Sequence, residues 1–230
     1  LEQAVQATSA SDAKTLDDKL TRLLLLSPLA AQAQHAMDSR RHSRRQYQDS
    51  LFRLIDFNDA FVDAVLSLRE DNRQQFTALL RDSIDNLCQH LKINSFTTRQ
   101  YDAIVHGLSR EIAVYEAAQH AGLEVAMTSR AVDAFGVDMQ IRDPADGYYI
   151  NIDCKTTSAF HFRLKDLVQE RRISRAEMID AEIDGYCKLV YRRDDKDIEV
   201  ILLRISQDEF GDIIDFGFAN EGAVVERIKR

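Results

Sequence analysis

The first 106 residues of this 230-residue chain contain no glycine and a single proline, Pro28. All eight glycines lie at or after Gly107. Glycine and proline interrupt regular structure, so a segment without them that carries apolar residues three and four positions apart favours helices. We therefore expect an all-helical N-terminal domain, residues 1–106, followed by a domain of different organisation, residues 107–230.

Cysteine is also scarce. The three cysteines, Cys88, Cys154 and Cys187, are odd in number and far apart. Neither they nor the six histidines have the spacing of metal ligands. A reduced, cytoplasmic setting is the simplest interpretation.

Long apolar runs are missing as well, so we expect no membrane partner. The segment RLLLLSPLAAQA, residues 22–33, resembles a signal peptide with its Ala-x-Ala cleavage site. Polar residues precede it and its flank has no net positive charge, which favours an amphipathic helix over secretion. The run is too short to span a bilayer.

Positive charge is in deficit, with 30 Lys and Arg against 38 Asp and Glu and a net charge of −8. This balance argues against a protein that coats nucleic acid non-specifically, because such binding needs many cations. It leaves open an enzyme that meets nucleic acid through a small basic surface and a metal ion.

In the first half, apolar periodicity predicts helices over residues 51–68 and 76–91. The second should bury a stripe of apolar side chains: Phe76, Leu79, Leu80, Ile84, Leu87 and Leu91. A further helix runs from about Gln100 to Ala121, with Thr97 or Thr98 as its N-cap.

In the second half, five short segments rich in β-branched and aromatic residues predict strands at 123–129, 136–141, 148–157, 185–193 and 197–205. The turn sequence RDPADG, residues 142–147, predicts a hairpin between the second and third strands. A helix is expected at about 164–183. The order of elements indicates an α/β or α+β core.

The third strand carries the sequence NIDCKTT, residues 151–157. Side chains alternate along a strand, so Asp153 and Lys155 share one face and Cys154 takes the other. The hairpin should bring Asp138 beside them, and Glu111 lies on the helix that precedes the first strand. Carboxylates of this kind suit Mg²⁺, which accepts one or two of them together with substrate phosphate oxygens. A neighbouring lysine can then orient or help deprotonate an attacking water.

With these residues, the segment GLSREIAVYEAAQHAGLEV…DAFGVDMQI…YYINIDCKTT resembles the PD-(D/E)XK nuclease superfamily over about residues 107–205. Its restriction-endonuclease-like and Holliday-junction-resolvase-like members are the most similar. The resemblance implies an αβββαβ core in which Asp138, Asp153, the Cys154 backbone carbonyl and Glu111 hold Mg²⁺ or Mn²⁺, while Lys155 acts on water. The proline that names the motif is absent, since Val137 precedes Asp138.

Each of these residues also has an ordinary interpretation. The ordinary interpretation of Asp153 and Lys155 is a solvated ion pair. That of Glu111 is a first-turn carboxylate favoured by the helix dipole. Asp133 competes for the role of metal ligand but precedes the strand. Cys154 is tempting as a nucleophile, yet alternation turns it toward the core.

Two basic segments are candidates for contact with nucleic acid, and for both the alternative is a solvated surface. Thr156 and Thr157 either contact phosphate or only end the strand. The residues predicted to bind nucleic acid are Thr156, Thr157, His161, Arg163, Lys165, Arg171 and Arg172, together with Arg40, Arg41, Arg44 and Arg45 from the run DSRRHSRRQ.

The sequence therefore predicts a metal-dependent nuclease that hydrolyses phosphodiesters, with DNA as the substrate class that the resemblance implies, in a restriction, repair or defence context. Its helical half would form a homodimer or contact a protein partner. The alternatives are a catalytically inactive nuclease-like module that binds nucleic acid or protein, and a helical assembly protein capped by the C-terminal domain.

Overall fold

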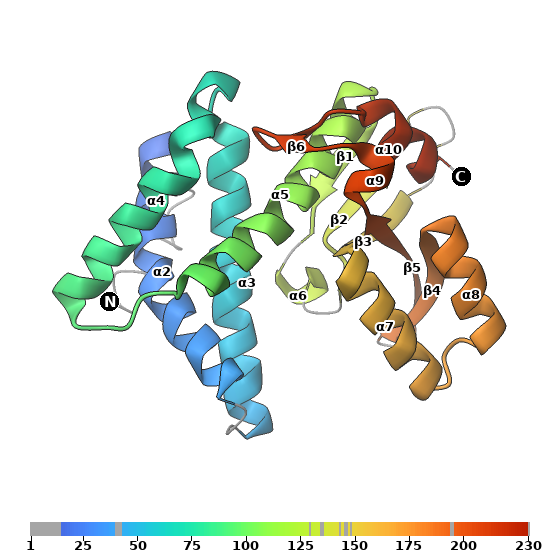
Figure 1. The fold of residues 1–230 in the computed structure, drawn as a ribbon, viewed down its shortest axis with the longest axis horizontal. Helices are drawn as coiled ribbons and strands as arrows, with labels where there is room; N and C mark the ends of the chain where they lie inside the picture. Colours follow the sequence, from blue (N-terminus) through green and yellow to red (C-terminus); the bar gives the residue numbers. More distant parts are fainter. Residues whose placement is uncertain are drawn as a thin grey trace. The chain divides into compact units, whose positions relative to one another are not determined.

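The computed structural model describes residues 15–39, 43–128, 130–133, 136–142, 144, 147, 149–193 and 196–229. It is a mixed α and β structure with a mixed five-stranded sheet, as expected for an α+β protein (Figure 1). The chain divides into two compact units, the first ending at Leu108 and the second beginning at Ser109. Helix α5, Thr98–His120, begins in the first unit and ends in the second.

Within the described residues, the first unit contains helices only: α2 (Leu16–Asp38), α3 (Arg44–Ser67), α4 (Glu70–Leu91) and the start of α5. Local capping explains where three of these helices begin. Thr15 and Ser43 form capping boxes with Asp18 and Gln46. Thr97 accepts a hydrogen bond from the Gln100 backbone N–H and so caps α5.

The segment 22–33 forms part of α2, and five of its apolar residues are buried, which confirms the expected helix: Leu23, Leu26, Ala30, Ala31 and Ala33. Among the described helices, none is both long and apolar enough to cross a bilayer. All three cysteines are unpaired and buried.

The predicted apolar stripe of α4 needs a correction. Phe76, Leu80 and Ile84 are buried, but Leu79 is 61% exposed and Leu91 is 41% exposed. Cys88 completes the buried row instead. Residues spaced by four lie along one side of a helix, and Leu79 falls off that line.

The sheet of the second unit has the order β1-β2-β3-β5-β4. Its strands are β1 (Glu124–Met127), β2 (Met139–Arg142), β3 (Tyr149–Thr156), β4 (Tyr186–Arg193) and β5 (Lys196–Ile205). The first three form an antiparallel meander, and β5 runs parallel to β3. The β2–β3 pairing confirms the expected antiparallel pair, although its connection is described only at residues 144 and 147.

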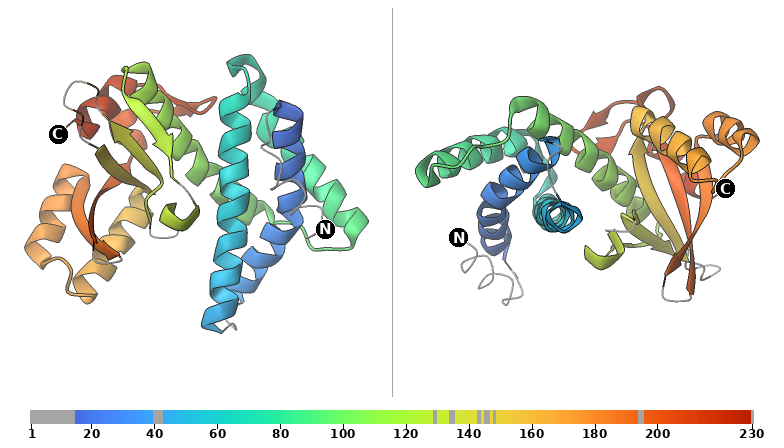
Figure 2. Two further views of the ribbon diagram at one scale, coloured as in Figure 1. Left: turned by 180° about the vertical axis from the view of Figure 1, so that it is seen from behind. Right: turned by 90° about the horizontal axis from the view of Figure 1, so that it is seen from below.

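Two apolar cores lie on the two faces of this sheet. Ile152, Cys154 and Leu203 pack with α5 residues such as Ala113 and Val114. Leu202, which is paired with Asp153 in the parallel register, packs with residues of α7 (Thr157–Gln169) and α8 (Arg175–Asp184). Figure 2 shows α7 and α8 on one side of the sheet from two further directions. Strand alternation thus assigns Asp153 to the α7 face and Cys154 to the α5 face.

The single helix expected at 164–183 is wrong, because two helices occupy the segment. Helix α7 starts at Thr157, directly after β3, and α8 starts at Arg175. Between them Arg171 has a left-handed backbone with φ of 58°, which a helix interior does not allow. Ser174 then forms a capping box with Glu177 and begins α8.

The second unit also contains short elements that periodicity does not reveal. They are α6 (Arg130–Asp133), α9 (Gln207–Phe210), β6 (Ile213–Ile214), β7 (Gly217–Phe218) and α10 (Glu221–Ile228). Helix α10 contributes Val224 and Ile228 to the core on the α5 face.

Candidate functional site

Asp138 lies one residue before β2, in a backbone held from both sides. Its N–H donates to the Ile152 carbonyl at 2.8 Å, and its carbonyl accepts from the Thr128 N–H at 3.1 Å. The β2–β3 register begins with Met139 paired to Ile152, so Asp138 lies just before the paired residues and bonds to the Ile152 carbonyl. The hairpin therefore fixes the position of Asp138 relative to β3.

The carboxylate of Asp138 turns toward β3. Its Oδ2 accepts a hydrogen bond of 2.6 Å from the Cys154 backbone N–H. The N–H and C=O of one strand residue point to the same side, so the Cys154 carbonyl also faces Asp138. Beside them, Lys155 Nζ donates to Asp153 Oδ1 in an ion pair.

Burial differs among these side chains. That of Asp153 is only 3% exposed, whereas Lys155 retains 29% of its side-chain surface. Glu111 and Asp138 are half-buried. The group is therefore partly open to solvent through Lys155, Asp138 and Glu111.

Glu111 joins the group electrostatically. Burial raises the pKa of Glu111 well above its ordinary value, and the charge of Asp138 raises it further, while Lys155 acts in the opposite direction. The charge of Asp133, at the end of α6, contributes as well. From the sequence, Asp133 competes with Asp138 for the role of metal ligand; in the structure its charge acts on Glu111.

The other two acids are also difficult to ionise. Burial raises the pKa of Asp138, and Lys155 and the Cys154 N–H partly offset this effect. Burial and the charge of Asp138 raise the pKa of Asp153 to about 7. Burial alone would lower the pKa of Lys155, but the charges of Asp138 and Asp153 more than compensate and raise it. Three carboxylates around one ammonium leave an excess of negative charge.

We tested whether these residues suit a divalent cation. Within the described ranges, no group of three or more His, Cys, Asp or Glu side chains is arranged so that it could hold a metal ion. Mg²⁺, however, commonly uses one or two carboxylates and completes its shell with water and phosphate oxygens. Asp138 and Asp153 provide this smaller set, and because burial raises the pKa of both, a divalent cation beside them would favour their ionised forms.

Gly136 leaves space next to this set. It has φ of +79°, and a Cβ at this position would lie 3.2 Å from Asp153 Oδ2. Its N–H donates to the Asp133 carbonyl at 2.6 Å, which closes the turn between α6 and β2. Sequence reasoning did not single out Gly136, although a glycine two residues before a candidate ligand is a signal for close approach.

The neighbouring Cys154 has the environment of a core residue. Burial raises the pKa of its thiol well above the ordinary value, and the charges of Asp138 and Glu111 raise it further. Its side chain belongs to the apolar core on the α5 face. The thiolate needed for nucleophilic attack is therefore strongly disfavoured.

Thr156 has a structural partner. Its Oγ1 accepts from the Ala159 N–H at 3.3 Å and caps α7. Thr157 is exposed as the first residue of that helix. The first residue of α7, Thr157, thus lies two positions after Lys155.

Most of the predicted basic residues on and after α7 have acidic partners. His161 contacts Glu182 at 2.5 Å, and Arg163 and Arg172 contact the two oxygens of Glu170 at 3.3 and 3.9 Å. Lys165 and Arg171 are exposed. This surface is consequently less positive than the sequence suggests.

The second basic run, DSRRHSRRQ, leads into α3. Arg40 and Arg41 lie outside the described residues. Arg44 begins α3, and Arg45 is exposed on the first turn of that helix.

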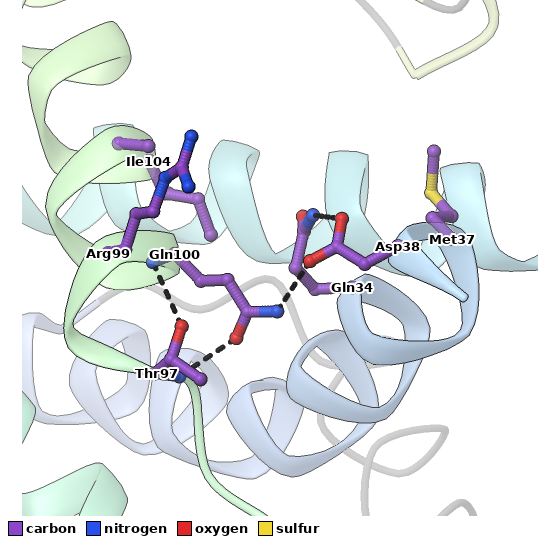
Figure 3. Close-up of a pocket in the computed structure, with 8 residues that line it drawn as sticks. Gln34, Met37, Asp38, Thr97, Arg99, Gln100 and Ile104 are labelled. Carbon is purple, nitrogen blue, oxygen red and sulfur yellow. Dashed lines mark hydrogen bonds between the residues drawn. The ribbon is translucent and has the colours of Figure 1, made fainter. Parts of the chain in front are cut away.

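A separate cavity of about 690 Å³ lies in the helical unit (Figure 3). Gln100 Nε2 donates to Asp38 Oδ2 at 2.7 Å, and Gln34 Nε2 donates to Asp38 Oδ1 at 3.0 Å. The first of these bonds links the end of α2 to the start of α5, and the second lies within α2. No predicted site residue lines this cavity, whose lining is Gln34, Met37, Asp38, Thr97, Arg99, Gln100, Ala103 and Ile104.

The structure therefore brings together Glu111, Asp138, Asp153 and Lys155, as the sequence pattern predicted, and adds Asp133 and Gly136 to their surroundings. Comparison with known proteins gives no assignment: no family model matches the chain, and no match was found among curated proteins or solved structures.

Proposed function

We propose that this protein is a metal-dependent nuclease with a PD-(D/E)XK-like site. The observation that supports this most is the hydrogen bond from the Cys154 N–H to the Asp138 carboxylate, which brings Asp138 next to the Asp153–Lys155 ion pair on β3. The arrangement of elements agrees in part with the core that the resemblance implies. A helix precedes three antiparallel strands, and β5 is parallel to β3, but the chain passes through the edge strand β4 between α8 and β5.

Asp138, Asp153 and the Cys154 carbonyl would hold Mg²⁺ or Mn²⁺, with Glu111 assisting. The cation would supply positive charge next to the scissile phosphate and make water more acidic. Lys155 remains protonated beside two acids, so its ammonium donates to a phosphate oxygen and stabilises the charge that develops there. This role for Lys155 agrees better with its raised pKa than proton abstraction does.

Cleavage of a substrate panel tests the proposal. The panel contains single-stranded, double-stranded and branched DNA and the corresponding RNA, each with Mg²⁺, Mn²⁺ or EDTA. We expect divalent-dependent cleavage of DNA that Lys155→Ala and Asp153→Asn abolish while circular dichroism shows an intact fold. Asp166→Asn is the matched control, because Asp166 is an exposed acid on α7. Cleavage that persists in Lys155→Ala would contradict the proposed mechanism.

One observation favours the rival, an inactive module. Lys155 already contacts Asp153, so the site neutralises part of its own charge without a metal. Calorimetric titration with Mn²⁺ separates the two. The nuclease proposal expects one site that Asp138→Asn removes, whereas the rival expects no binding to wild-type protein. A homodimer or partner contact through the helical unit remains a prediction, which solution mass measurement tests.

A further inference from the structure

A cluster of two arginines, one glutamate and one tyrosine lies on the α7 side of the sheet. Arg163 Nη1 contacts Glu170 Oε1 at 3.3 Å, and Arg172 Nη1 approaches Glu170 Oε2 at 3.9 Å. The Tyr191 side chain also interacts electrostatically with that of Arg163, and Arg172 Cζ lies 4.4 Å from the centre of the Tyr191 ring. Two guanidinium groups share one carboxylate, so the cluster retains one positive charge.

Arg163 is the member that lies on α7, the helix that follows the strand with Asp153 and Lys155. Its neighbours on α7, Phe160 and Leu164, pack on Leu202. Leu202 is paired with Asp153 in the β3–β5 register, so α7 covers the face that carries Asp153 and Lys155.

The guanidinium of Arg163 is held in place but not enclosed. Glu170 and Tyr191 fix it from α7 and β4, while 26% of its side-chain surface stays exposed. An arginine has five N–H donors in a rigid fork, more than these two partners use. Such a fork matches the paired oxygens of a phosphate better than a lysine does. The exposed Lys165 and Arg171 have no comparable anchoring among the described contacts.

We propose that Arg163, held by Glu170 and Tyr191, binds a backbone phosphate of the nucleic acid next to the phosphate at Asp138 and Asp153. This inference rests on the proposed function for its ligand class. It assigns to Arg163 the positioning of the strand and to Lys155 the stabilisation of the reacting phosphate. The alternative is a purely structural role, in which Arg163 links α7 to β4 and does not contact nucleic acid.

Binding measured without cleavage tests this assignment. The affinity of the full chain for a labelled DNA duplex is followed by fluorescence anisotropy at several salt concentrations, with EDTA and separately with Ca²⁺. Each phosphate contact to duplex DNA contributes about 0.9 to the slope of log affinity against log salt. We expect Arg163→Gln to lower this slope by about 0.9 and to weaken binding about tenfold. Arg163→Lys should keep the slope and bind with intermediate affinity, because it keeps the charge and loses the fork.

Arg69→Gln is the matched control, because Arg69 also pairs with a nearby acid, Asp71, at 3.5 Å and its side chain is 84% exposed. It should change neither the slope nor the affinity. Tyr191→Phe should weaken binding without changing the slope, since it removes an anchor of Arg163 and no charge.

The result that overturns the inference is an Arg163→Gln variant with the wild-type slope, even if its thermal stability falls. Such a variant would show that Arg163 only links α7 to β4. Wild-type protein that binds no nucleic acid would overturn it as well. Wild-type protein that binds DNA through Arg163 but cuts nothing with Mg²⁺ or Mn²⁺ would support this inference and refute the proposed nuclease activity.

Discussion

Replacing Asp153 by asparagine should stabilise the metal-free protein at neutral pH while removing its proposed activity. Burial and the charge of Asp138 raise the pKa of Asp153 from its ordinary 3.8 to about 7. At about 1.4 kcal/mol per pKa unit, this gap corresponds to about 4 kcal/mol of unfolding free energy. Asparagine has nearly the same shape and no charge, so it avoids the cost of burying an anion.

The difference in stability between wild type and Asp153→Asn should depend on pH. Below pH 3.8 the folded and unfolded chains both hold the proton, and wild type and variant should differ little. Between pH 3.8 and about 7 the folded wild type keeps a proton that the unfolded chain has released, so its stability falls as pH rises. Above that range the difference in favour of Asp153→Asn should level off at up to about 4 kcal/mol.

The assay is urea unfolding in metal-free buffer at several pH values, with the exposed Asp166→Asn as control. Mg²⁺ added at pH 7.5 should then stabilise wild type but not Asp153→Asn, because a ligand that binds only the folded state raises its stability. A variant that is less stable than wild type at pH 7.5, or a difference that does not grow with pH, would refute this reasoning about the site's charge.

Three further substitutions test other parts of the account. Gly136→Ala should lower the unfolding free energy by about 1–2 kcal/mol and slow cleavage, because its backbone is left-handed and its Cβ would meet Asp153 Oδ2 at 3.2 Å; unchanged stability and cleavage would remove the role given to this glycine. Cys154→Ala should keep metal-dependent cleavage and lose on the order of 1 kcal/mol of stability in urea unfolding, and loss of cleavage in a folded variant would restore the thiol as a candidate nucleophile. Thr97→Ala should lower thermal stability by about 1 kcal/mol through the lost N-cap of α5, whereas an unchanged melting temperature would show that the cap contributes nothing.

Much of the candidate site could be predicted from the sequence because it depends on short-range rules. Alternation along β3 separates Asp153 from Cys154, and a hairpin brings Asp138 next to β3 without any long-range information. The surroundings of Glu111 were harder to foresee, because its coupling to Asp133 depends on where α6 ends.

Other features depend on contacts between distant segments, which periodicity does not encode. Arg171 has a left-handed backbone, although its residue type does not predict one, and this splits the expected helix into α7 and α8. Glu170 and Glu182 neutralise much of the positive charge of the basic segment. The pair between His161 and Glu182 depends on the packing of α7 against α8, which the sequence pattern does not predict. Leu79 is apolar, yet it lies outside the row of α4 residues spaced by four that faces the core, and it is exposed.

The most direct test of the central claim is the rate at which the purified chain cuts supercoiled plasmid DNA in Mn²⁺ or Mg²⁺, measured side by side with Asp138→Asn. Asp138 and Asp153 are proposed to act together on one cation, so removing either charge should remove the activity. We expect wild type to cut the plasmid only when the divalent ion is present and Asp138→Asn not to cut it at all. Equal rates for the two proteins, or a wild-type rate that EDTA does not change, would contradict the proposed site.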